Sequence, residues 1–185
     1  NIEITHDYSG YENQNKFLEG TGSMVLNRKN NIAYCALSNR SNKELFMKFC
    51  NDLNYSPVLF NSIYESKPIY HTNVLMSICN NFSIICLESV ENQDEKNNLI
   101  RSLEDSELDI IDISYDQMRC YLGNCIQLVD KDLNPKLVMS TSAFKSIKSN
   151  QLSRILKHTE IIHSDIKTIE NYGGGSARCM IAEIF

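Results

Sequence analysis

Tryptophan is absent from this sequence of 185 residues, proline occurs three times and glycine seven times. Apolar residues make up 42% of the chain, which is typical of a globular domain and excludes collagen-like and disordered proteins. No apolar run approaches the roughly 18 residues of a membrane-spanning helix. The first residues, Asn1–Ile4, resemble neither a signal peptide nor a transit peptide. The length fits one large domain or two small ones.

The chain also lacks a large excess of either sign of charge. The 18 basic and 23 acidic residues give a formal net charge of −5, and the basic residues form no run. Surfaces that bind nucleic acids or anionic membranes need clustered basic residues, so we expect neither partner. The small acidic excess would at most favour a cationic small molecule.

The seven cysteines form no C-x-x-C pair, and together with the four histidines they are too scattered to suggest a zinc site. Six of them lie in apolar or amphipathic stretches, where a free thiol packs as a small hydrophobic group. These are Cys35, Cys50, Cys79, Cys86, Cys120 and Cys125. Free thiols favour a reducing, cytoplasmic location. Phosphate-binding, dinucleotide-binding and H-E-x-x-H motifs are absent, so we expect no cofactor and no metal.

An internal repeat organises the chain. Gly22, Asn73, Asn124 and Gly175 are each 51 residues apart, and each of the first three precedes an apolar strand-like run, a polar turn and a second such run. Turns rich in Asn, Asp or Pro between β-prone runs are typical of hairpins. A helical segment and a third short strand follow each hairpin. The alternative is a non-repetitive α+β domain whose spacings coincide by chance.

The predicted unit is therefore β-β-α-β. Its helices are expected at 42–53, 94–103 and 151–157, and its third strands at 57–60, 109–113 and 160–163. We place the modules at about 17–67, 68–118 and 119–169 within a single domain, 1–185, with a closing module that begins at 170–185. If such modules close around an axis, their starts meet at the centre.

Cys179 follows three consecutive glycines, Gly173–Gly175, which leave room for a ligand to approach the backbone. Arg178 precedes it directly, and a neighbouring cation favours the thiolate, the nucleophilic form of cysteine. One interpretation is a catalytic cysteine. The other is a flexible loop that leads into a buried strand, 179–184, with Cys179 as filler.

His71 and Glu19 also lie near module starts. A thiol and an imidazole brought together make a nucleophile and a general acid/base, which favours catalysis over a purely structural role for His71. Glu19 is either a carboxylate that faces a ligand or a loop residue in solvent. Asn73 and Asn124 share one register of the repeat, either as turn residues or with amides aimed at a ligand.

These motifs resemble the guanidino-group modifying enzymes of the pentein superfamily, which contains arginine deiminases, dimethylarginine hydrolases and amidinotransferases. The resemblance rests on Leu18-Glu19-Gly20, His71-x-Asn73 and Gly173–Met180, in that order along nearly the whole chain. It is greatest for the citrulline-utilisation branch of arginine-deiminase-related hydrolases. It implies an α/β fold, namely a five-bladed propeller of β-β-α-β modules around a central active site.

The resemblance further implies that the chain holds about 3.6 of five modules, roughly the C-terminal three-fifths of such a protein. A substrate-binding aspartate of the family then lies outside this chain, and a missing N-terminal segment or a second copy of the chain would complete the ring. Asn73 stands where arginine deiminases have aspartate, and an amide does not neutralise a guanidinium. A neutral ureido substrate such as citrulline, or a differently held guanidine, is then favoured.

In the mechanism that the resemblance implies, Cys179 attacks the guanidino or ureido carbon of an arginine-like or citrulline-like small molecule and forms a covalent intermediate. His71 protonates the departing amine and then activates the water that releases the product. Glu19 accepts hydrogen bonds from the substrate nitrogens. The chain would then be a hydrolase that acts on C–N bonds of linear amidines.

Four further residues are candidates for substrate binding. They are Asn73, Asn124, Gly175 and Arg178, of which Arg178 either binds a substrate carboxylate or only perturbs Cys179. Two alternatives to hydrolysis stay open, namely transfer of the amidino group to an acceptor amine and a non-catalytic pentein module that binds a ligand. A papain-like protease is disfavoured because it has its cysteine before its histidine.

Overall fold

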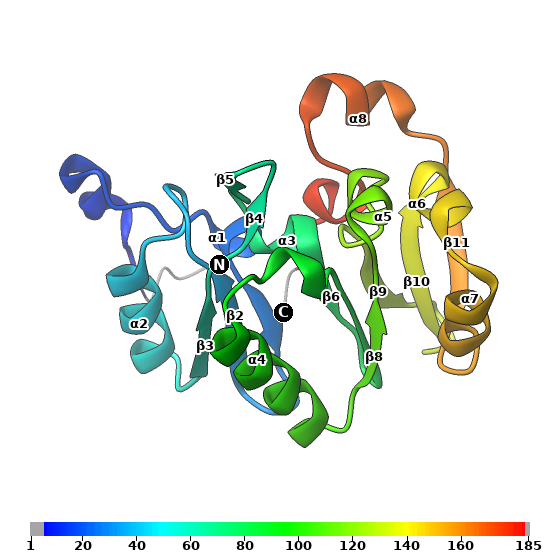
Figure 1. Ribbon diagram of the computed structural model, residues 1–185, viewed down its shortest axis with the longest axis horizontal. Helices are drawn as coiled ribbons and strands as arrows, with labels where there is room; N and C mark the ends of the chain where they lie inside the picture. Colours follow the sequence, from blue (N-terminus) through cyan, green and yellow to red (C-terminus); the bar gives the residue numbers. More distant parts are fainter. Residues whose placement is uncertain (1–5, 184–185) are drawn as a thin grey trace.

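The computed structural model describes residues 6–183, in which three three-stranded sheets and a two-stranded ribbon are present (Figure 1). The strands of the first sheet are β1 (Val25–Asn27), β2 (Ile32–Ala36) and β3 (Ser56–Phe60). Those of the second are β6 (Met76–Ile78), β7 (Phe82–Ile85) and β8 (Asp109–Asp112). Those of the third are β9 (Ile126–Val129), β10 (Pro135–Ser140) and β11 (Glu160–Ser164). The ribbon pairs β4 (Ile63–Tyr64) with β5 (Lys67–Pro68).

Each three-stranded sheet repeats one connection. The middle strand is antiparallel to the strand before it and parallel to the strand after it. A parallel pair needs a crossover, and helices supply it. The crossover helices are α2 (Lys43–Asp52), α4 (Gln93–Asp105) and, in the third sheet, α6 (Thr141–Ser146) with α7 (Ser149–Ile155). The mixed α/β class and the hairpin–helix–strand order expected from the sequence are thus confirmed.

Several short elements were not expected from the sequence. They are the ribbon β4–β5 and helix α6, together with η1 (Ser9–Gln14), α1 (Gly20–Ser23), α3 (Thr72–Leu75), η2 (Leu87–Ser89), α5 (Tyr115–Arg119), α8 (Lys167–Gly173) and η3 (Ala177–Met180). The alternative of a buried strand at 179–184 is wrong for its described part, because Cys179 lies in the 3-10 helix η3 and is exposed. Residue 184 is outside the described residues.

Local sequence explains where the crossover helices begin. Asn42 accepts a hydrogen bond from the backbone N–H of Leu45 at 3.1 Å, and Asn92 accepts one from Glu95 at 3.0 Å. A side chain at the N-cap satisfies an N–H that has no partner within the helix, which stabilises the helix start. In the first two units the crossover helix therefore begins directly after a polar asparagine cap.

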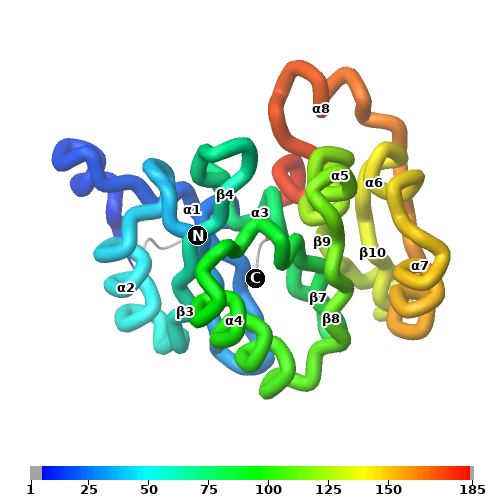
Figure 2. The backbone as a smooth tube through the Cα atoms, in the orientation of Figure 1, coloured from blue at the N-terminus to red at the C-terminus, as the bar shows by residue number. Residues whose placement is uncertain are grey.

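The units pack on one another through a shared apolar core. Helix α4 of the second unit packs on β3 of the first, and α7 of the third packs on β8 of the second, as Figure 2 lets the reader follow. The hydroxyl groups of Tyr34 and Ser102 meet at 3.0 Å between the first two units. The core includes the fully buried Phe60, Phe82 and Leu99.

Within residues 6–183 we find no helix with the length and hydropathy of a membrane span. The same residues contain no cluster of three or more His, Cys, Asp or Glu side chains that could hold a metal ion.

The starts of the three units lie against one another. Each first strand is preceded by a single turn of chain, which is α1 before β1, α3 before β6 and the turn at 120–123 before β9. The Thr72 hydroxyl donates to the carbonyl of Ser23 at 2.5 Å and accepts from the N–H of Ala36 at 2.8 Å, which holds α3 against the first unit. Gly123 packs directly on the backbone of α3.

Gly123→Ala is expected to destabilise the protein by about 1–3 kcal/mol, the usual cost of overpacking. A Cβ at this position would lie 2.5 Å from the carbonyl oxygen of Val74 and 2.8 Å from the carbonyl carbon of Leu75, so backbone must move. Gly10→Ala is the matched control, because its Cβ meets nothing within 4 Å. Urea denaturation compares the two variants. Equal midpoints for both would show that the unit starts do not pack as described.

Candidate functional site

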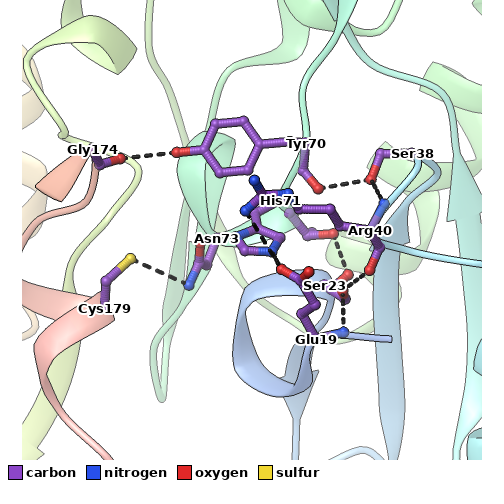
Figure 3. Close-up of polar contacts among 10 residues, drawn as sticks. Glu19, Ser23, Ser38, Arg40, Tyr70, His71, Asn73, Gly174 and Cys179 are labelled. Atoms are coloured by element: carbon purple, nitrogen blue, oxygen red, sulfur yellow. Dashed lines mark hydrogen bonds and ion pairs between the residues drawn. The ribbon is translucent and has the colours of Figure 1, made fainter. Parts of the chain in front are cut away.

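Six of the seven residues proposed from the sequence gather where the unit starts converge, and Figure 3 labels four of them, Glu19, His71, Asn73 and Cys179. Glu19 directly precedes α1, His71 directly precedes α3 and Asn73 lies within α3. Asn124 follows the turn before β9, and Cys179 lies in η3. Four segments that are distant in the sequence thus place an acid, an imidazole, two amides and a thiol together.

The Glu19 carboxylate and the His71 imidazole form one half of the site. Their Oε2 and Nε2 atoms are 2.6 Å apart, and the side chains are 40% and 16% exposed, respectively. Gly22 faces the ring, since a Cβ there would lie 2.7–2.9 Å from three imidazole atoms. The absent side chain of Gly22 therefore leaves room for His71, and the carboxylate fixes the orientation of the imidazole.

Sequence reasoning missed two residues beside this pair. The guanidinium of Arg40 lies 3.6 Å from Glu19 Oε2 and 5.2 Å from the ring centroid of Tyr70. The Tyr70 hydroxyl donates to the carbonyl of Gly174 at 2.8 Å, so it joins the His71 segment to the glycine loop. Ser38 donates to the Tyr70 carbonyl at 2.7 Å and thereby ties the Arg40 loop to the same segment. Arg40 belongs to no recognisable motif, and Tyr70, which directly precedes His71, was given no role from the sequence.

Cys179 differs from the other six cysteines in its exposure. It is exposed, whereas five of the others are buried and Cys120 is intermediate. Burial raises the pKa of Cys35 and of Cys86 to about 12, and that of Cys125 to about 11. Because only the thiolate is a good nucleophile, these buried thiols are poor candidates for catalysis. The interpretation of the buried cysteines as core residues is confirmed.

Two amides lie beside the Cys179 sulfur. The Asn124 side chain donates to Sγ at 3.1 Å, and the Asn73 side chain donates to it at 3.7 Å. Asn124 also donates to the Asn73 carbonyl at 2.8 Å. The Oδ1 atom of Asn73 is buried and has no hydrogen-bond partner among residues 6–183. Figure 3 shows the Asn73 amide between the sulfur and the His71 ring in that view.

The glycine loop holds Cys179 in place. Gly174 ends α8 with φ of 69°, a left-handed conformation that glycine adopts without strain. Gly175 lies so close to Cys179 that a Cβ there would be 3.0 Å from both Cβ and Sγ of that cysteine. Ser176 donates to the buried carboxylate of Glu170 at 2.7 Å, which anchors the end of the loop. Gly175 thus serves close packing against Cys179, and Gly174 serves the left-handed turn that ends α8.

The side chain of Arg178 points to other partners than Cys179. Its Nη1 donates to the carbonyl of Ile181 at 2.9 Å, and its Nη2 lies 3.7 Å from the Glu183 carboxylate. The Glu183 carboxylate also lies 3.7 Å from the guanidinium of Arg28. Arg178 therefore has an internal counter-ion, and its assignment to a substrate carboxylate stays a prediction.

A cavity of about 300 Å³ lies beside the first strands of the three units. Asn73 and Arg178 line it, whereas Glu19, His71 and Cys179 do not. The reactive groups therefore lie outside this cavity, and their hydrogen bonds, rather than the cavity, define the candidate site.

Comparison with known proteins identifies the family of the chain. A family model described as N,N dimethylarginine dimethylhydrolase, eukaryotic, matches residues 1–185, which is the whole chain. No curated protein matches the sequence.

Three solved structures share the fold at low sequence identity. ArgZ, an arginine dihydrolase from the ornithine–ammonia cycle in cyanobacteria, has a TM-score of 0.71 and 12% identity over 90% of this chain and 25% of its own. AgrE, solved with ornithine and NAD⁺, has a TM-score of 0.68 and 15% identity over 91% and 23%. The agmatine deiminase of C. jejuni has a TM-score of 0.51 and 13% identity over 89% and 54%. The chain spans about a quarter to about half of the length of these structures.

Proposed function

Because the chain belongs to the eukaryotic N,N-dimethylarginine dimethylhydrolase family, we propose that it hydrolyses a C–N bond of a guanidino or ureido group in an arginine-like or citrulline-like small molecule. The membership confirms the resemblance to guanidino-group modifying enzymes, and the narrower likeness to the citrulline-utilisation branch stays a prediction. The observation that carries the proposal is an exposed thiol, Cys179, joined through Asn73 to the segment that holds the Glu19–His71 pair.

We assign the role of nucleophile to Cys179. Its thiolate attacks the planar carbon of the substrate and forms an S–C bond, and the C–N bond to the departing amine then breaks. The amine leaves with a proton from His71. Water next adds its oxygen to the same carbon while His71 takes up its proton, and the S–C bond breaks to free the thiolate. The net reaction consumes one water and releases one amine.

We assign to Glu19 two roles. In the free protein its carboxylate holds the imidazole of His71 at 2.6 Å. With 40% of its side chain exposed, it also has room to accept hydrogen bonds from the substrate nitrogens. This second role was expected from the sequence, and the first is added by the structure.

Arg40 supports recognition of an amino-acid substrate. Its side chain is 55% exposed and lies at the rim of the site, against Glu19 and Tyr70. A guanidinium binds a carboxylate through two parallel hydrogen bonds, so Arg40 fits the carboxylate end of an arginine-like or citrulline-like molecule. This position suits that role better than that of Arg178, which already faces the Glu183 carboxylate.

For the reacting end of the substrate, the neutral amide of Asn73 favours a ureido group or a guanidine whose charge is balanced by Glu19. The buried Oδ1 of Asn73 has an unused acceptor position that a substrate N–H would satisfy. Among the other assigned residues, Gly175 leaves space beside the sulfur rather than contacting a ligand itself.

The three sheets further suggest how the domain is built. We propose that they are blades of a five-bladed β/α-propeller, with modules at about 17–67, 68–118 and 119–169 and a closing module from 170. The support is the common strand order of the three sheets and the packing of α4 on β3 and of α7 on β8.

Product analysis tests the proposed function. The full-length protein is incubated separately with methylated arginines, arginine and citrulline, and amines and amino acids are quantified by mass spectrometry. Release of methylamines, ammonia or ornithine, with one water consumed, supports hydrolysis. Formation of a new guanidino compound only when an acceptor amine is present would instead identify an amidinotransferase. Unchanged substrate in every reaction contradicts the proposal.

A further inference from the structure

Asn124 is the residue that joins the segments around the Cys179 sulfur. It is 1% exposed and uses both ends of its side-chain amide. The amide nitrogen donates to the Cys179 sulfur at 3.1 Å and to the Asn73 carbonyl at 2.8 Å. The amide oxygen accepts from the N–H of Ser176 at 3.1 Å, and the backbone carbonyl of Asn124 accepts from the N–H of Arg178 at 3.3 Å.

The other charged and titratable groups near Cys179 are engaged elsewhere or are neutral. Arg178 faces Glu183, His71 is bonded to Glu19, and the buried Glu170 accepts from two serine hydroxyls. The phenols of Tyr70 and Tyr121 bond to the carbonyls of Gly174 and Glu170. Burial raises the pKa of each phenol, and the proximity of Cys179 to Tyr70 and of Glu170 to Tyr121 raises it further. Neutral amides are therefore the donors that meet the sulfur in the described part of the chain.

Hydrogen bonds to the charged form of an acid favour that form. An amide N–H held by a buried side chain is already oriented toward the sulfur, so it needs no rearrangement when charge develops there. We propose that Asn124 is a catalytic residue that stabilises the Cys179 thiolate and fixes its direction, in place of the neighbouring cation Arg178. This inference rests on the proposed role of Cys179 as nucleophile.

The repeat supports the assignment independently. Asn73 and Asn124 occupy the same position in successive units, 51 residues apart, and both amides point to the one sulfur. The donor–sulfur distance of 3.1 Å for Asn124 is shorter than the 3.7 Å of Asn73. We therefore expect substitution of Asn124 to have the larger effect on the thiol.

The test measures alkylation of Cys179 by iodoacetamide as a function of pH in the full-length protein, with the site identified by peptide mass spectrometry. Asn124→Asp replaces the N–H donor by an oxygen of the same size and keeps the acceptor for Ser176. We expect the alkylation rate at pH 7 to fall about tenfold, with the rate–pH curve displaced to higher pH. Asn73→Ala should lower the rate less, and Arg178→Gln should leave the curve in place.

Cys50, which is buried in helix α2 of the first unit and distant from these bonds in the sequence, reports the fold in the same sample. Its alkylation should be equal in all variants, and Asn124→Ser provides a second, smaller substitution if Asn124→Asp unfolds. Wild-type reactivity of Cys179 in both Asn124 variants would overturn the inference, as would a displaced curve in Arg178→Gln. Because alkylation needs no substrate, a wild-type protein without turnover would refute the proposed function and leave this measurement interpretable.

Discussion

Cys179→Ser is expected to lower kcat for hydrolysis of the guanidino or ureido substrate by about 10⁴-fold or more, the usual scale for loss of a catalytic nucleophile. A serine hydroxyl in the same place is rarely ionised near neutral pH, and the two amides beside Cys179 are not bases that could deprotonate it. Ligand binding should persist, because the Glu19, Arg40 and Asn73 groups are unchanged. Steady-state kinetics and calorimetric titration measure the two effects separately.

Cys120→Ser is the matched control, since Cys120 is half-buried and takes part in none of the contacts of the site. It should retain wild-type kcat. An active Cys179→Ser protein would refute the assignment of the nucleophile. Preferential labelling of Cys35 or Cys125 by an electrophilic amidine would refute it as well. We expect Cys179 to be labelled instead, because burial raises the pKa of both of the other thiols.

His71→Ala is expected to lower kcat by about 10³-fold or more, which is within the range that general acid/base groups and catalytic histidines contribute. The first step needs a proton for the departing amine, and the second needs a base for water. If a substrate with a good leaving group completes the first step without His71, the covalent adduct on Cys179 should accumulate. Mass spectrometry of the intact protein detects it as an added mass that Cys179→Ser lacks.

His163→Ala serves as the control for this prediction. The His163 ring stacks on Phe144 and bonds to the Thr141 hydroxyl in the third unit, away from the Glu19 pair. Its kcat should match that of the wild-type protein. A His71→Ala variant with wild-type kcat would exclude His71 from the chemistry, and equal losses in both variants would indicate damage to the fold instead.

Much of the fold was predictable because its signals are local. Polar caps such as Asn42, apolar periodicity and polar turns act over a few residues, so helices α2, α4 and α7 and the third strands appear where the sequence places them, whereas α6 was not predicted. The single turns at the unit starts were not predicted. A helix of four residues such as α1 or α3 has too few hydrogen bonds to form alone, and packing between the units stabilises it.

Some residues of the candidate site were likewise predictable from the sequence, and others were found only in the structure. The sequence alone singled out Glu19, His71 and Cys179 as candidates, because an acid, an imidazole and a thiol near the starts of repeated modules have recognisable chemistry even before they are brought together. It did not identify Arg40 or Tyr70, since an arginine and a tyrosine in loops have no local signature. Only the packing of the first unit against the segment before α3 places them at the site.

The tertiary structure also decided where the side chains of Arg178 and Cys179 point. From the sequence, Arg178 is the neighbour of Cys179 and the natural partner of its thiolate. In the 3-10 helix that contains both, successive side chains diverge, so Arg178 reaches Glu183 while the Cys179 sulfur meets Asn124. Residue types and their spacing were thus determined by the sequence. Long-range packing decided which of these groups form hydrogen bonds. A hydrogen bond needs a distance of about 3 Å between donor and acceptor, and adjacency along the chain does not specify that distance.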